Sequence, residues 1–118
     1  MNKGDCFWGD IDGGTNEHYW IVLCDPKAGQ IALVNFTTGC GGPKSQKVSK
    51  AFFDTLKYDS ELAWFESVVR DDTEIVQMVN DSALESKIAM PVKKIDTLMM
   101  IARSQGLVPV EVDKILKS

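Results

Sequence analysis

His18 is the only histidine in the chain, and histidine is the side chain best suited to proton transfer near neutral pH. It stands where a glycine-rich stretch, residues 12–16, meets an aromatic and aliphatic run. Scaffolds often place functional groups where a loop joins a strand. The imidazole is therefore the first candidate for a general acid or base. A purely structural histidine is the alternative interpretation.

Two hydroxyl groups and two lysines add to this candidate. Thr37 and Thr38 end a later apolar run, and a hydroxyl can orient a phosphate group. Lys44 and Lys47 follow within ten residues and can balance phosphate charge. The alternatives are strand-end threonines and a solvated basic loop.

A hairpin is the element that would bring these groups together. Residues 18–24 and 30–37 are rich in β-branched and aromatic side chains, which predicts two strands. Residues 25–29 carry the proline and glycine of a tight turn. His18 and Thr37 are nearly equidistant from residue 27. Antiparallel pairing would therefore place the imidazole, the hydroxyls and the basic segment at one end of the hairpin.

The remaining pattern predicts an α+β fold. Residues 4–11 read as a further strand, so the first three strands form an antiparallel meander, which would close into a small barrel or a curled sheet. Residues 61–70 fit either a strand or a short helix. Ser82 to Glu85 resembles a helix-capping box, and Val92, Ile95, Met99 and Ala102 form an apolar stripe at helical spacing. We expect one domain over 1–118, with a β-rich part (1–70) covered by three or four helices of a helical part (71–118).

Composition narrows the class of protein. The chain has 118 residues and three cysteines, Cys6, Cys24 and Cys40, an odd number that disfavours a disulfide framework. Their spacing does not suit zinc, so we predict reduced thiols and no metal or cofactor. The longest aromatic and aliphatic run, residues 19–23, is far shorter than a membrane helix of roughly 18 to 20 residues. No signal-peptide pattern is visible. These features predict a cytoplasmic protein without a membrane partner.

Charge is unevenly distributed along the chain. The net charge of −4 disfavours a general nucleic-acid binder. Residues 43–57, however, carry four lysines against one aspartate. This basic segment is either a solvated loop or a local phosphate-binding surface.

Residues 4–38 resemble the start of the MazF/PemK-like toxin family. The resemblance rests on Gly4-Asp5 followed by an apolar strand, a glycine-rich loop, an aliphatic strand ending in Asp25-Pro26, and a strand ending in Thr37-Thr38. It implies an SH3-like barrel with helices, a homodimer, and metal-independent cleavage of single-stranded RNA that is restrained by an antitoxin partner. The loop arginine of the family is absent, and His18 stands in its place.

Two functions follow as hypotheses. The first is a toxin-like endoribonuclease, a hydrolase in which His18 transfers protons, Thr37 or Thr38 orients the phosphate, and Lys44 or Lys47 binds RNA and balances charge. The alternative is a non-catalytic SH3-like barrel that uses the same groove, or its helical face, to bind a protein partner. The missing arginine and the acidic net charge favour the alternative, whereas the convergence of His18, the threonines and the lysines favours the nuclease.

Overall fold

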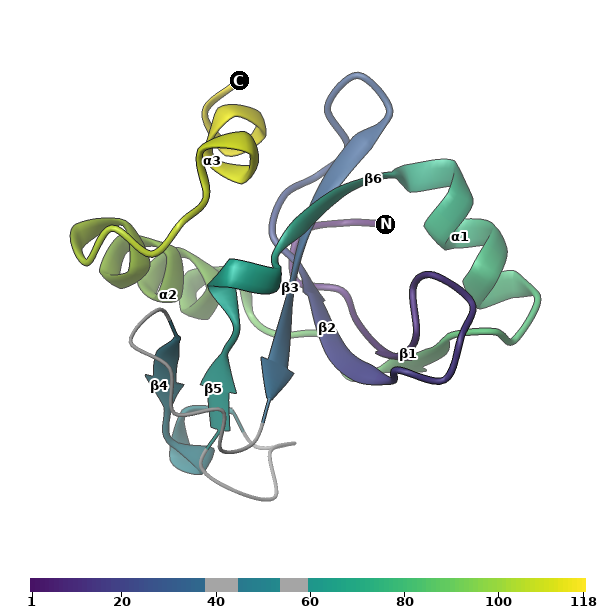
Figure 1. Cartoon of the computed structure of the whole chain (residues 1–118), viewed down its shortest axis with the longest axis horizontal. Helices are drawn as coiled ribbons and strands as arrows, with labels where there is room; N and C mark the ends of the chain where they lie inside the picture. Colours follow the sequence, from purple (N-terminus) through teal and green to yellow (C-terminus); the bar gives the residue numbers. More distant parts are fainter. Residues whose placement is uncertain (38–44, 54–59) are drawn as a thin grey trace.

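The computed structural model describes residues 1–37, 45–53 and 60–118. Its strands are β1 (Cys6–Gly9), β2 (His18–Val22), β3 (Gln30–Thr37), β4 (Gln46–Val48), β5 (Ser60–Leu62), β6 (Val68–Asp71) and β7 (Glu85–Lys87). Its helices are α1 (Asp72–Asn80), α2 (Val92–Ser104) and α3 (Val110–Lys117), with two short 3₁₀ turns, η1 (Lys50–Phe52) and η2 (Trp64–Glu66). Figure 1 shows α1 on one side of the strands and α2 and α3 on the other.

The strands form one antiparallel sheet in the order β4-β5-β3-β2-β1-β7, with β6 also paired to β3. The predicted α+β class and the β1-β2-β3 meander are confirmed. Of the two predicted forms, a small barrel or a curled sheet, the barrel is wrong, because the sheet does not close on itself. Its two ends, β4 and β7, are strands of three residues that lie at opposite edges and do not pair with each other.

The hairpin of β2 and β3 has the predicted register, with Tyr19 opposite Phe36 and Val22 opposite Leu33. A bridge between Lys27 and Gln30 closes its turn. Gly29 in this turn has a φ of 79°, a left-handed conformation that glycine adopts without a steric penalty.

The sheet buries apolar side chains on both faces. Alternate residues of a strand point to opposite sides, so Trp20 and Val22 enter one core cluster while Ile21 enters the other. The run Ile31 to Phe36 of β3 is buried throughout. Ile75 of α1 covers the first face, and α2 and α3 cover the second. Cys6 and Cys24 are free thiols buried in the second cluster.

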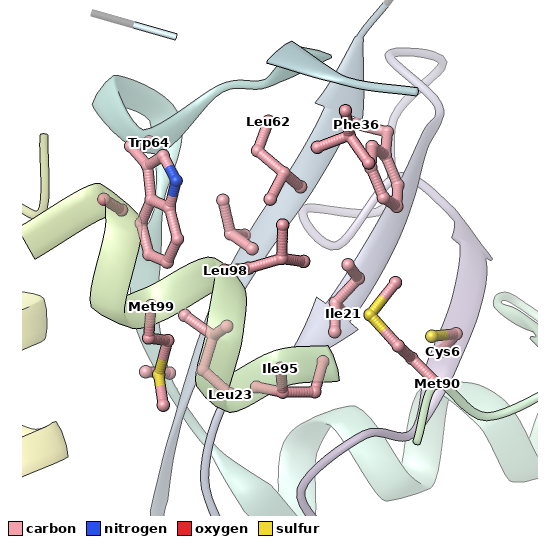
Figure 2. Packing of buried hydrophobic residues seen from close by; sticks show 14 of the residues in the cluster. Cys6, Ile21, Leu23, Phe36, Leu62, Trp64, Met90, Ile95, Leu98 and Met99 are labelled. Atoms are coloured by element: carbon pink, nitrogen blue, oxygen red, sulfur yellow. The ribbon is translucent and has the colours of Figure 1, made fainter. Parts of the chain in front are cut away.

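The apolar stripe of α2 packs onto the sheet, as predicted, through Ile95, Met99 and Ala102. Leu98 joins them and lies near Leu62 and Trp64 (Figure 2). Val92 is the exception, because its side chain is 48% exposed at the first position of the helix.

Two regions differ from the sequence pattern. The predicted capping box at Ser82–Glu85 is wrong, because Ser82 has a φ of 62° and residues 85–87 form β7. β7 pairs with β1, which is far away in the sequence, and this long-range pairing outweighs the local preference of residues 82–85 for a helix. The ambiguous segment 61–70 forms strand, 3₁₀ turn and strand in succession. Of the three helices found in the described residues, none is both long and apolar enough to cross a bilayer.

Candidate functional site

His18 and Thr37 end their strands side by side. Tyr19 pairs with Phe36, so His18 and Thr37 are the next two residues in the same antiparallel register. Facing residues of such a pair lie roughly 5 Å apart and project to the same side of the sheet. The His18 side chain is 21% exposed, so the imidazole is reachable from solvent. Continued by one residue, the register of β2 and β3 therefore puts these two predicted residues opposite each other.

The same row continues across the sheet to Lys47. Thr37 pairs with Glu61 of β5, and Glu61 pairs with Lys47 of β4. On the other side, His18 pairs with Gly9 of β1, which has no side chain beyond its backbone. Lys47 is exposed and lies two strand spacings, about 10 Å, from Thr37. Three of the five predicted site residues thus share one row on one face.

The other two predicted residues, Thr38 and Lys44, lie outside the described residues. Cys40, which the sequence predicts to be a reduced thiol, lies outside them as well. Within the ranges that the structure covers, no group of three or more histidine, cysteine or acidic side chains is arranged to hold a metal ion.

Glu66 is a member of the site that the sequence did not reveal. Its Oε2 lies 4.0 Å from His18 Nε2 and accepts a hydrogen bond of 3.4 Å from Asn35 Nδ2. Glu66 reaches this position from η2, because the backbone N–H of Ala63 donates to the carbonyl of Asn35 and places the 3₁₀ turn beside β3. A carboxylate next to an imidazole can orient the ring.

Asn35 contacts Glu66, and Trp20 contacts His18, on the buried side of this pair. Asn35 is fully buried, and its Oδ1 has no hydrogen-bond partner in the described part of the chain. A buried unpaired oxygen costs free energy, which favours a functional role for the polar side chain. The Trp20 ring meets His18 edge to face at a centroid distance of 6.0 Å, and its Nε1 donates to the carbonyl of Gly9. These contacts restrict the imidazole on its buried side.

The glycine-rich loop before His18 is ordered by Asp10. Its carboxylate accepts hydrogen bonds from the backbone N–H groups of Asp12 and Asn16, at 2.8 and 2.9 Å. These two bonds are the main reason why the pKa of Asp10 lies below its ordinary value. A third bond, from the backbone of Gly14, and the nearby charge of His18 lower the pKa further. Asp12 in turn pairs with Arg70 at 3.3 Å. The loop therefore fixes a negative charge near His18 and joins β1 to the site.

No protein-family model matches the chain, and a search of curated proteins finds no match either. Function must therefore be argued from the site itself.

Proposed function

We propose that the chain is an endoribonuclease that cleaves single-stranded RNA without a metal ion, similar to the MazF/PemK-like toxins that its first 38 residues resemble. The observation that carries this proposal is the His18–Glu66 pair at the end of the hairpin where Thr37 ends β3. An imidazole with an orienting carboxylate can take the proton of a ribose hydroxyl, and a threonine hydroxyl can orient the phosphate.

The reaction would begin with His18 taking the proton of a ribose 2′-hydroxyl. The 2′ oxygen then attacks the adjacent phosphorus, the bond from phosphorus to the 5′ oxygen breaks, and solvent protonates the leaving oxygen. Glu66 stabilises the imidazolium, since the carboxylate is already 4.0 Å from Nε2. Thr37 orients the phosphate. Lys47, together with Lys44 and Thr38 outside the described residues, supplies charge and hydrogen bonds to the RNA backbone.

His18→Ala should lower the rate of cleavage by roughly 10²-fold or more, the typical worth of a general acid or base. The measurement is cleavage of a labelled single-stranded oligoribonucleotide, with and without a chelator, alongside chemical denaturation. We expect activity that survives the chelator and a variant that still folds, with a loss in the free energy of unfolding of about 0.5 to 1.5 kcal/mol from the missing contact with Trp20.

Glu66→Gln provides the second arm of this test, since it keeps the shape of the side chain and removes the charge near the imidazole. It should also slow cleavage. Glu74→Gln, an exposed position on α1, is the matched control and should cleave at the wild-type rate. Undiminished cleavage by His18→Ala would contradict the proposal.

The second candidate function is a non-catalytic module that binds a protein partner. Two carboxylates favour it, because Glu61 lies within the row and Glu66 lies beside it, while Lys47 is the only lysine among the described residues of the row. RNA would meet repulsion there, whereas a protein partner could present matching cations. In this case no cleavage is expected, and Lys44→Ala and Lys47→Ala should weaken partner binding in a salt-dependent way. An antitoxin-like protein and a homodimer are the partners that the resemblance implies.

A further inference from the structure

A groove separates the β4 edge of the sheet from α2. Its cavity has a volume of about 640 Å³, which is within the range of about 300 to 1,000 Å³ that is usual for ligand sites. All three residues of β4 line one wall. Leu98, Ile101 and Gln105 line the other wall and lie on one face of α2, because they are three and four positions apart.

The strand in this groove is an edge of the sheet. Among the strands that the structure describes, β4 pairs with β5 alone. An edge strand presents backbone N–H and C=O groups that can pair with an added strand.

Buried hydrogen bonds of Gln46 connect the two walls of the groove. Gln46 Nε2 donates to the carbonyl of Leu98 at 3.2 Å, and Trp64 Nε1 donates to Gln46 Oε1 at 2.8 Å. These bonds fix β4 relative to α2, so a ligand would not need to order the two walls.

The two sides of β4 differ in chemistry. Gln46 and Val48 turn toward α2, where the groove offers Phe52 and Ile101, the latter 37% exposed. Lys47 turns to the opposite side and is exposed. Glu61 also lines the groove, but it is buried and accepts a hydrogen bond from the hydroxyl of Ser45. Glu61 faces Lys47 from the β5 side, so the charge nearest to a strand added at the outer edge of β4 is the positive charge of Lys47.

A second copy of the chain is a poor occupant of this edge. Lys47 is the middle residue of a three-residue strand, so two-fold pairing of β4 with β4 would place one Lys47 opposite the other. Like charges directly opposite each other destabilise a strand pair. A segment with an acidic residue at this position would instead gain an opposite-charge pair.

We propose that β4 binds an extended peptide of a partner protein by strand addition, and that the peptide carries an acidic residue between two apolar residues. The acidic side chain lies opposite Lys47. The two apolar side chains point to the other face and pack against Phe52 and Ile101. This inference does not depend on the proposed nuclease activity, because it uses the edge of the sheet rather than the His18 end of the row.

The test is fluorescence anisotropy with a labelled peptide of the sequence serine-glycine-valine-glutamate-valine-glycine-serine. We expect saturable binding to the whole chain, and binding that is weaker by about tenfold or more when lysine replaces the glutamate. Lys47→Glu should reverse this preference. In an added strand, only every second peptide amide donates to β4. N-methylation of these amides should abolish binding, whereas N-methylation of the amides between them should leave binding unchanged.

Ile101→Asp should abolish binding of the peptide, whereas Met100→Asp is the matched control. Met100 is the preceding residue on α2, is 65% exposed and does not line the groove. Three outcomes would overturn the proposal: equal binding of the glutamate and lysine peptides, no binding to the folded wild-type chain, or loss of binding in both helix variants.

Discussion

His18 lies close to residues from separate parts of the chain. Trp20 belongs to the same strand, Thr37 comes from the partner strand of the hairpin, and Glu66 comes from η2. The first two could be predicted, because strand alternation and a short turn fix their positions from the sequence alone. Glu66 could not be predicted, because its place depends on an irregular turn that the apolar pattern of residues 61–70 does not distinguish from a strand or a helix.

Cys6 gives a prediction at the scale of a single residue. Burial, more than any other cause, raises the pKa of this thiol from 9.0 to about 11. The folded state therefore holds the proton more tightly than the unfolded state does. The stabilisation from Cys6 should be fully present below pH 9 and should be lost as the pH rises toward 11, by about 2 to 3 kcal/mol in the free energy of unfolding.

The measurement for Cys6 is chemical denaturation between pH 8 and 11, with Cys6→Ala as the reference that removes the thiol. The difference in unfolding free energy between wild type and variant should narrow over this range. Iodoacetamide at pH 8, followed by mass spectrometry, should leave Cys6 unmodified in the folded chain. A constant difference across the range would show that the thiol does not titrate as described.

At the scale of elements, periodic segments were predictable and long-range pairings were not. The strands β1, β2 and β3 and the helix α2 carry clear alternation or helical spacing, and each forms where the pattern indicates. β7 was missed because its three residues are all exposed and contain no apolar alternation. It is a strand because Met90 and Gly4 bond through their backbones and bring the segment before α2 alongside β1.

Ile95 tests the packing of α2 on the sheet. Its side chain is fully buried in the larger core cluster, so Ile95→Ala should lower the free energy of unfolding by about 2 to 5 kcal/mol. Ile88→Ala is the matched control, because that isoleucine is 71% exposed and should cost less than about 0.5 kcal/mol. Denaturant titration of both variants makes the comparison, and similar losses in the two would argue against the packing of α2.

At the scale of the whole molecule, the two core clusters share the strands β1, β2 and β3. One cluster contains Trp64 and the other contains Trp20, on opposite faces of the sheet. Because losing either cluster exposes one face of the same strands, we predict that both faces unfold in a single transition. This remains the basis for expecting one domain.

The double variants Trp8→Phe/Trp20→Phe and Trp8→Phe/Trp64→Phe each keep one of the three tryptophans, so its fluorescence follows one face of the sheet. Within each variant, the fluorescence transition should coincide with the loss of secondary structure measured by circular dichroism. Fluorescence that changes well before the circular dichroism in either variant would mean that the two faces unfold independently.

Residues 63–67, between β5 and β6, carry Glu66 of the candidate site but do not belong to a strand of the sheet. Phe36 pairs with Leu62 and Leu33 pairs with Val68, so residues 63–67 lie opposite only residues 34 and 35 of β3. The chain therefore carries three residues more than continuous pairing needs, and Glu66 is within this excess. A related sequence that lacked three residues here could keep both pairings and lose the carboxylate. An insertion or deletion of three residues between β5 and β6 would then add or remove the site during evolution, while the rest of the sheet stayed the same.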